Sequence, residues 1–290
     1  MNKSSENAKS CSLPMAHGIA LITVNAMVCI LGSFGNLLVC FAIATHPLLR
    51  QTSNYLLLSL AITDLLVTLV CQPFLLEIVY NRTFFHECKA SLEMPYRLIV
   101  NLSCSASVIH LASISLDRFI AVAFPLHYKI VMKKCGLLIL LTASWALPIS
   151  IPLLMVFLPP SFLKKFMAMA SFSLSYFVII FSYFMIAVFL LRYKKKRKDL
   201  RVRTVSIKFT SRREVRVAYT LAFATGVFTV CWVPVKTMRF LISMTPNNPL
   251  YMWLRTLALS NSAMNFLIYS ARIRAFKEAY ASIFQKMCRL

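Results

Sequence analysis

Long apolar runs separated by short polar stretches dominate the chain. Seven runs of about 20 residues or more, enough to cross a bilayer, lie at 17–45, 54–80, 93–124, 135–158, 165–191, 214–243 and 250–270. An eighth segment, 271–287, is apolar only at helical spacing, with Arg274, Lys277 and Glu278 between the apolar positions. The pattern predicts an all-α membrane protein: a seven-transmembrane helix bundle followed by a short helix in the cytosolic interface.

The composition supports a membrane protein and argues against a nucleic-acid-binding one. Of 290 residues, 59% are hydrophobic and 14% are charged, whereas a soluble domain has about 45–50% apolar residues. The charged minority comprises 32 Lys and Arg against 9 Asp and Glu, a net charge of +23. A soluble protein with this charge would suggest nucleic acid. In so apolar a chain, we expect no nucleic-acid polymer as partner and expect the cations to gather on one side of a membrane.

The cations are unevenly shared between the two sides that seven spans define. One side holds 22 Lys and Arg and the other holds six, and Lys/Arg-rich connections face the cytosol. We therefore expect an extracellular N-terminus (1–16), a seven-span domain (17–270) and a cytosolic interface helix and tail (271–290). The N-terminus lacks the basic-then-apolar order of a cleaved signal peptide, so the first run should be retained. The run "RYKKKRKDLRVR" should bind anionic lipids and face a cytosolic partner.

Several polar residues lie inside the apolar runs, where they are candidates for function. Asp64 is the acidic member, and an isolated carboxylate in a low-dielectric medium is very unfavourable. Oxygen groups on other spans could surround a hard cation with it, and Na⁺ is the abundant extracellular one. The predicted sodium site comprises Asp64, Ser107, Asn261, Ser262 and Asn265. Asn36 is a further polar residue inside an apolar run, outside this predicted site. The alternative is a plain hydrogen-bond network between helices. No hydrolase, P-loop or zinc motif appears, so we expect no enzyme and no cofactor beyond this ion.

Several motifs in these runs resemble the rhodopsin-like (class A) G-protein-coupled receptors. They are "GNLLVCFAI" in the first span, "NYLLLSLAITDLL" in the second, "LDRFIAVAFPLHY" after the third, Trp145 in the fourth, "FTVCWVP" in the sixth, and "NSAMNFLIY" with "ARIRAFKEAY" at the end. The resemblance covers nearly the whole chain and agrees with the predicted topology. It implies a plasma-membrane receptor that activates a heterotrimeric G protein in response to an extracellular ligand, with arrestin as a further partner.

The resemblance also assigns roles to inner residues. Asp117 and Arg118 would cap the third helix, and Arg118 would pair with Glu214 in the inactive state, since Glu214 lies 20 residues before Pro234. The alternative reading of Asp117–Arg118 is a simple interface anchor. The resemblance also singles out Tyr183 and Tyr269, which would meet near Arg118 in the active state, and Leu126, which would enter the G protein. Phe228 and Trp232 would lie under the ligand pocket, and Pro234 would kink the sixth helix.

The chain also departs from the family pattern. Phe266 and Ser175 stand where prolines are usual, and Glu93 stands where the family has a disulfide cysteine. The outer Cys11 and Cys88 either pair with each other in an oxidising compartment or remain free thiols. The second outer connection is short, about 158–165, as in the melanocortin, adenosine, cannabinoid and lysolipid group. Modification sites expected from their location are the sequons at Asn2 and Asn81 for glycan and Cys288 for palmitate.

The residues of the outer halves indicate what the ligand is not. Leu259 stands where an opsin has its retinal lysine, and Val100 where aminergic receptors have an aspartate. The expected pocket comprises Arg97, Val100, Cys104, Lys236, Arg239 and Arg255. Its cations favour a small anionic ligand such as a nucleotide or a lipid acid, unless they extend outward to water and headgroups. The alternatives are a peptide receptor, a constitutively active receptor and, outside the class, a membrane transporter, although no internal repeat is found.

Overall fold

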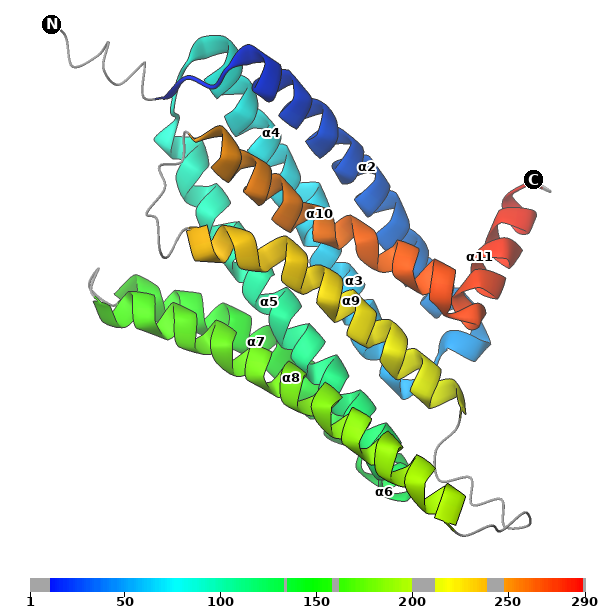
Figure 1. Cartoon of the computed structure of the whole chain (residues 1–290). Helices are drawn as coiled ribbons and strands as arrows, with labels where there is room; N and C mark the ends of the chain where they lie inside the picture. Colours follow the sequence, from blue (N-terminus) through cyan, green and yellow to red (C-terminus); the bar gives the residue numbers. More distant parts are fainter. Residues whose placement is uncertain (1–10, 133–134, 158–161, 200–211, 239–247, 289–290) are drawn as a thin grey trace, which may run out of the picture. The chain divides into compact units, whose positions relative to one another are not determined.

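The computed structural model describes residues 11–132, 135–157, 162–199, 212–238 and 248–288. Within these ranges every regular element is helical (Figure 1). The helices are α2 (Met15–Thr45), α3 (Thr52–Leu66), α4 (Gln72–Tyr80), α5 (Ala90–Ala123), α6 (Pro125–Val131), α7 (Cys135–Phe157), α8 (Phe162–Asp199), α9 (Arg212–Thr237), α10 (Pro249–Arg272) and α11 (Arg274–Met287). A 3-10 turn covers Pro47–Leu49, and π-helical turns at Val67–Cys71 and Asn81–Phe85 continue α3 through α4 as one long helix.

Each of the seven predicted apolar runs falls on a helix over the residues that the structure describes, and the eighth segment forms α11. α8 continues well past the predicted end at residue 191, to Asp199, through most of the basic run. The short α6 was not predicted; it begins at Pro125, whose fixed φ suits the first turn of a helix. Only residues 158–161 lie between α7 and α8, so the connection between the fourth and fifth predicted runs is as short as expected.

Length and apolarity alone identify fewer spans than seven. Among the described residues, five helices are long and apolar enough to cross a membrane, and Cys135–Ser150 forms a shorter apolar helix. α10 is not one of these five, because it carries Arg255, Asn261 and Asn265, all of them buried within its unit. Buried polar residues lower the apolarity of a span without exposing charge to lipid.

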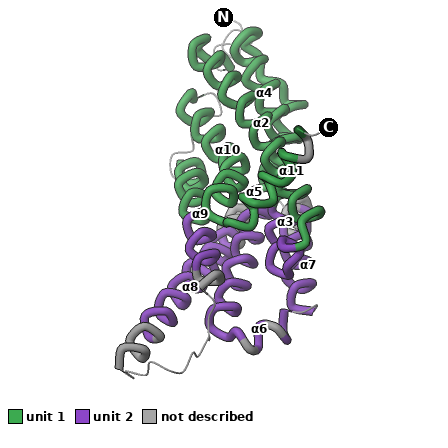
Figure 2. Tube along the Cα trace, turned by 90° about the vertical axis from the view of Figure 1, so that its right-hand side faces the viewer, with its two compact units in different colours: residues 1–47, 61–103, 224–290 green, residues 48–60, 104–223 purple. Residues whose placement is uncertain are grey.

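The chain divides into two compact units, which Figure 2 colours separately. Unit 1 comprises residues 1–47, 61–103 and 224–290, and within it α2 contacts both α4 and α10. Its core joins Leu21 of α2, Leu75 of α4, and Met252 and Leu259 of α10. Small residues allow close helix approach in membranes: a Cβ added to Gly35 of α2 would lie 1.9 Å from the ring of Phe266.

Unit 2, residues 48–60 and 104–223, is joined by polar contacts between helices. The indole nitrogen of Trp145 in α7 donates to the Ser59 hydroxyl over 2.8 Å, and this hydroxyl lies 2.8 Å from Nε2 of His110 in α5. Nδ1 of His110 lies 2.7 Å from the carbonyl of Ala106. A carbonyl can only accept, so Nδ1 carries the hydrogen, and in a neutral ring Nε2 then accepts from the Ser59 hydroxyl.

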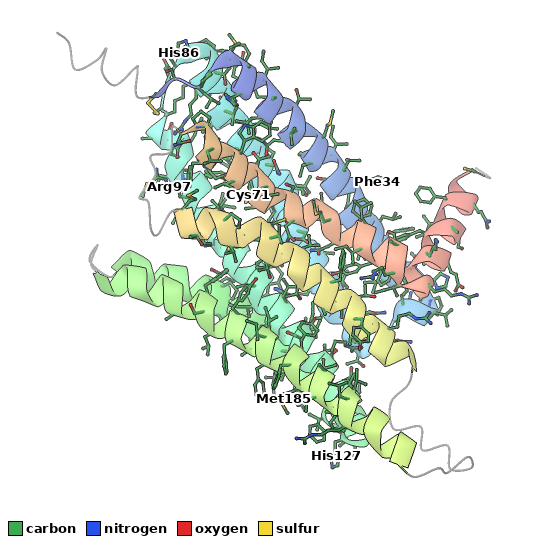
Figure 3. The ribbon with its side chains drawn as sticks, viewed as in Figure 1. Phe34, Cys71, His86, Arg97, His127 and Met185 are labelled. Carbon is green, nitrogen blue, oxygen red and sulfur yellow. A yellow bond between two sulfur atoms is a disulfide. The ribbon has the colours of Figure 1, made fainter. Side chains whose placement is uncertain are left out.

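Large apolar side chains are also exposed along the outward faces of several helices. Ile30 and Phe34 of α2 and Phe177 and Phe184 of α8 are each more than half exposed, and Figure 3 labels Phe34 among the side chains of α2. Exposed apolar surface of this extent marks contact with a membrane or another protein. The exposed apolar side chains of α2 and α8 therefore agree with the prediction that these helices lie in a membrane.

Candidate functional site

A cavity of about 200 Å³ opens in unit 1 between α5, α9 and α10. The residues that line it are Glu93, Tyr96, Arg97, Val100 and Asn101 of α5, Trp232, Val235 and Lys236 of α9, and Tyr251, Arg255, Ala258 and Leu259 of α10. Each helix contributes residues at three- and four-residue spacing, which places them on one face. The lining therefore combines several cations with aromatic rings and one carboxylate.

Arg255 is the most deeply placed cation of this cavity. Its side chain is buried, and its guanidinium lies 4.3 Å from the centre of the Tyr96 ring and 5.7 Å from that of Tyr251. Nε donates to the Tyr96 hydroxyl over 3.3 Å, and Nη1 lies 3.4 Å from the sulfur of Met252. No carboxylate of the described residues forms an ion pair with it. Aromatic faces thus hold a buried positive charge that no carboxylate in the described part of the chain approaches to ion-pair distance.

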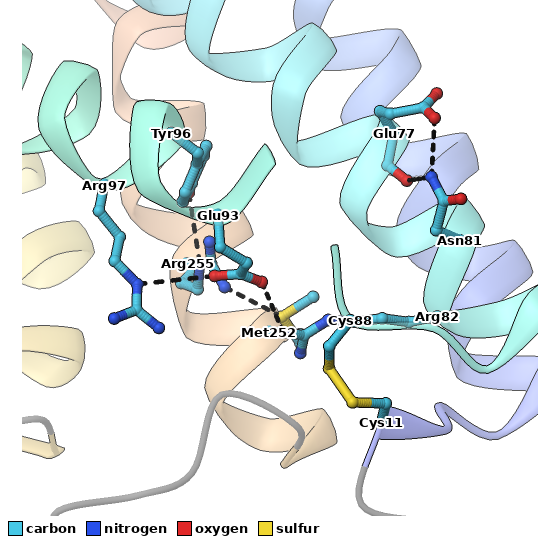
Figure 4. Close-up of polar contacts among 10 residues, drawn as sticks. All are labelled: Cys11, Glu77, Asn81, Arg82, Cys88, Glu93, Tyr96, Arg97, Met252 and Arg255. Atoms are coloured by element: carbon cyan, nitrogen blue, oxygen red, sulfur yellow. Dashed lines mark hydrogen bonds and ion pairs between the residues drawn. A yellow bond between two sulfur atoms is a disulfide. The ribbon is translucent and has the colours of Figure 1, made fainter. Parts of the chain in front are cut away.

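Glu93 is the carboxylate of the cavity, and two arginines hold it (Figure 4). Nη2 of Arg82 lies 2.5 Å from Oε1 of Glu93, and Nε of Arg97 lies 3.6 Å from Oε2. Lys236 lies over the Trp232 ring, with its nitrogen 5.7 Å from the ring centre. Because Glu93 already engages two cations, the cavity keeps an excess of positive charge.

The polar residues around Asp64 form a second site in unit 1. Asp64 is fully buried, and Nδ2 of Asn265 donates to its Oδ2 over 2.6 Å. Nδ2 of Asn36 donates to the backbone oxygen of Ser262 over 2.9 Å. Oδ1 of Asp64 and Oδ1 of Asn261 are both buried without a hydrogen-bond partner among the described groups. Buried oxygens left in this way suit a hard cation. Ser107 is also buried but belongs to unit 2, so its part in such a site stays a prediction.

Asp117 and Arg118 lie near the end of α5 in unit 2, and both are buried. Nε of Arg118 donates to Oδ2 of Asp117 over 2.8 Å. The hydroxyl of Tyr128 in α6 donates to Oδ1 of Asp117 over 2.9 Å, and Nη2 of Arg118 lies 3.3 Å from the same hydroxyl. Sequence reasoning missed Tyr128, because only the position of α6 brings it back to Asp117.

The packing beside this pair joins α5, α8 and α9. Val122, Ile186 and Ala218 form a buried cluster, against which Tyr183 packs. Val122 follows Arg118 by one helical turn, and Ala218 follows Glu214 by one turn. The backbone of Glu214 lies in α9; its side chain and that of Leu126 are outside the described part of the chain, so the Arg118–Glu214 pair stays a prediction.

The remaining switch residues predicted from the sequence occupy two helices of unit 1. Phe228 and Trp232 of α9 stack with ring centres 5.9 Å apart, and Pro234 lies inside the same helix. Tyr269 is buried at the end of α10, and its ring lies 5.8 Å from that of Phe276 in α11. Trp232 therefore touches both its stacking partner and the cavity.

A model of the family "7 transmembrane receptor (rhodopsin family)" matches residues 35–269. The chain belongs to this family. The receptor is 28% identical to the histamine H2 receptor of Cavia porcellus, over 88% of this chain and 76% of that one. It is 24% identical to the adenosine receptor A2a of Homo sapiens, over 93% of this chain and 73% of that one. The crystal structure of squid rhodopsin has the same fold, with a TM-score of 0.80 and 19% identity over 95% of this chain and 87% of that one.

Membership confirms that the receptor is a rhodopsin-like signal transducer of the membrane with a seven-helix bundle and a C-terminal helix, and not an enzyme. The predicted pocket residues have different outcomes. Arg97, Val100, Lys236 and Arg255 line the cavity. Cys104 does not, because it lies one helical turn beyond Val100 and is buried. Arg239 lies outside the described residues. Sequence reasoning missed Tyr96 and Tyr251, although their helical spacing to Arg97 and Arg255 was a usable signal.

The predictions for the outer end of the receptor also have mixed outcomes. A disulfide joins Cys11 and Cys88, with Cα atoms 5.6 Å apart, so the two thiols are not free. Asn81 is a correction: it is 2% exposed, and its amide nitrogen donates to both the backbone and the carboxylate of Glu77. A glycan acceptor must be accessible, so Asn81 is not one in this fold. Asn2 lies outside the described residues, and Cys288 is exposed.

Proposed function

We propose that this receptor lies in the plasma membrane with its N-terminus outside and responds to a small anionic ligand, a nucleotide or a lipid acid, in the cavity between α5, α9 and α10. The observation that carries the proposal is the buried guanidinium of Arg255, held by aromatic rings and without an ion-pair partner among the described carboxylates. Each charge-assisted hydrogen bond to a ligand phosphate or carboxylate would contribute about 1.5–3 kcal/mol. Two such bonds would together contribute about 3–6 kcal/mol, part of the roughly 8 kcal/mol that corresponds to a micromolar Kd.

The cavity favours a small anion over the other ligand classes. Its volume of about 200 Å³ suits a small molecule better than a peptide. Relatives are named for histamine and adenosine, but a cationic amine needs a carboxylate, and Glu93 is already held by Arg82 and Arg97. Val100, at the position of the aminergic aspartate, offers none. A peptide ligand and ligand-independent signalling are the alternatives: no response to any member of the panel below would favour a peptide, and full exchange without any addition would favour ligand-independent signalling.

The experiment measures nucleotide exchange on a purified G protein by the reconstituted receptor. The panel comprises ATP, succinate, oleoyl lysophosphatidate, histamine and adenosine. We expect an anionic member to activate the wild type, Arg255→Ala to lower its potency by at least about tenfold, and Arg255→Lys to recover only part, because Lys lacks the planar contact with Tyr96. Lys89→Ala is the matched control, since Lys89 is exposed and outside the cavity. A histamine or adenosine response that is indifferent to Arg255→Ala would contradict the proposal.

The proposal extends to the inner half of the receptor. Asp117, Arg118 and Glu214 form a latch that opens on activation and exposes Arg118 to the G protein, with Tyr183, Tyr269 and Leu126 as further contacts. Asp64, Asn261, Ser262 and Asn265, with Ser107, hold Na⁺ in the inactive state. The orphaned oxygens of Asp64 and Asn261 support this assignment, because a hydrogen-bond network alone would leave them unpaired.

Cytosolic lipids and arrestin are the remaining proposed partners. The first part of the basic run, residues 192–199, continues α8, and a run of this charge binds anionic headgroups. Cys288 follows the amphipathic α11 and is exposed, as an acceptor of palmitate must be. Palmitate labelling of the wild type and of Cys288→Ser, and arrestin recruitment on activation, check these two assignments.

A further inference from the structure

We infer that Arg82, which does not line the cavity, sets the charge preference of the pocket by neutralising Glu93. This inference rests on the proposed anionic ligand and concerns the same site. The cavity lining holds three cations, Arg97, Lys236 and Arg255, and one carboxylate, that of Glu93. The net negative charge that Glu93 presents to a ligand depends on the cations that pair with it. Arg82 pairs with Glu93 from outside the cavity lining (Figure 4).

The contacts of Glu93 are unequal. Oε1 lies 2.5 Å from Nη2 of Arg82, whereas Oε2 lies 3.6 Å from Nε of Arg97, beyond hydrogen-bond distance. Arg82 is also the more buried partner, with a side chain 3% exposed against 53% for Arg97. Charge pairs are screened least where water is excluded, so Arg82 supplies most of the neutralisation. The positive charge of Arg97 is consequently less compensated by Glu93 and can attract an anionic ligand.

The fold holds Arg82 in this position from several sides. Its backbone oxygen accepts a hydrogen bond from the amide of Leu13 over 3.2 Å. The disulfide between Cys11 and Cys88 joins the N-terminal segment to the chain just after the π-helical turn that contains Arg82. The neighbouring Thr83 packs so closely on α2 that a Cβ on Gly18 would lie 2.1 Å from its hydroxyl. A cation fixed in this way can compensate a carboxylate without itself reaching into the cavity.

Removal of Arg82 should therefore change which ligands the pocket accepts. Of its described ion-pair partners, Glu93 would then keep only the distant and half-exposed Arg97. Its carboxylate would repel an anion bound near Arg255. Anion affinity should fall and affinity for a cation should rise. Removal of Glu93 as well should restore anion binding, because no carboxylate would remain to be compensated. A residue that merely supports the fold would not show this reversal.

The experiment follows thermal unfolding of the purified full-length receptor as inorganic pyrophosphate or oleoyl lysophosphatidate is titrated, since a ligand of the folded state raises the unfolding temperature. The variants are Arg82→Met, Glu93→Gln, the double variant and Arg82→Lys. We expect Arg82→Met to weaken the apparent affinity for the anion by about tenfold, and Glu93→Gln to strengthen it by about threefold. The double variant should bind within about threefold of the wild type, and Arg82→Lys should bind nearly as the wild type does.

The outcomes separate this inference from the proposed function. If neither anion stabilises the wild type, or if Arg255→Ala binds the anion as tightly as the wild type does, the proposed anionic pocket is wrong. The inference about Arg82 is then wrong as well. If the wild type binds through Arg255 but the double variant stays as weak as Arg82→Met, Arg82 acts by contact or by folding and the inference is overturned. If Arg82→Met does not fold, Glu93→Gln decides alone: tighter anion binding supports the inference, and unchanged or weaker binding overturns it.

Discussion

The hydroxyl of Tyr128 offers a direct way to perturb the proposed latch without touching its charges. Tyr128→Phe keeps the ring and removes one hydrogen bond, the 2.9 Å contact to Oδ1 of Asp117. A hydrogen bond to a charged group contributes about 1.5–3 kcal/mol when buried. Tyr128 is only half-buried and its 3.3 Å contact with Arg118 is long, so we expect a loss of about 1 kcal/mol. If the contact belongs to the inactive state, its loss should raise the active population roughly fivefold.

The assay is agonist-free exchange of GTPγS on purified G protein, with the amount of folded receptor matched between variants. Tyr219→Phe is the control, because Tyr219 is 61% exposed on α9 in the same unit. We expect about fivefold higher basal exchange for Tyr128→Phe and no change for the control. Basal exchange equal to that of the wild type, in a receptor that unfolds at a lower temperature, would show that Tyr128 supports the fold in both states, and the reasoning would be wrong.

Three further predictions test other parts of the receptor. Glu214→Ala should raise basal G-protein activation while Arg118→Ala lowers coupling; unchanged basal activity of well-expressed Glu214→Ala would exclude the latch. Asp64→Asn should abolish any dependence of agonist affinity on sodium, and a wild-type affinity that ignores sodium would leave only a hydrogen-bond network. Cys11→Ser with Cys88→Ser should lower the unfolding temperature, since opening a 77-residue loop removes at most about 4.5 kcal/mol; an unchanged temperature would show that the tether adds no stability.

The sequence predicted the helices well because lipid leaves few choices. Backbone groups in a bilayer must be paired within the segment, so a long apolar run is a helix. Cations in the outer halves of such helices were equally predictable. Arg97, Lys236 and Arg255 were expected in the pocket from residue type and position, and all three line the cavity. The same reasoning placed Cys104 there wrongly, because a residue one turn further along a helix lies at a different depth.

Other features depend on tertiary contacts that no periodicity reveals. Arg82 was counted as one more cation of an outer connection, and only the structure shows its buried pair with Glu93. The Asn81 sequon was read as accessible, but the helix continues through it and buries the amide. Tyr128 lies in the unpredicted α6, which turns it back to Asp117. In each case the deciding partner is on another helix, or the deciding residue lies in an element that the sequence pattern did not show.

Phe266 illustrates how a departure from the family pattern acquires a physical meaning. A proline at this position would lack the amide hydrogen that bonds to the carbonyl of residue 262 and would clash one turn back. With Phe266, α10 runs uninterrupted from Pro249 to Arg272. The ring occupies the space opposite Gly35, where a Cβ would lie 1.9 Å away, and Asn36 donates to the Ser262 carbonyl from the same helix. A sharp kink of α10 at this point during signalling would therefore have to break a backbone hydrogen bond that a proline would never have made.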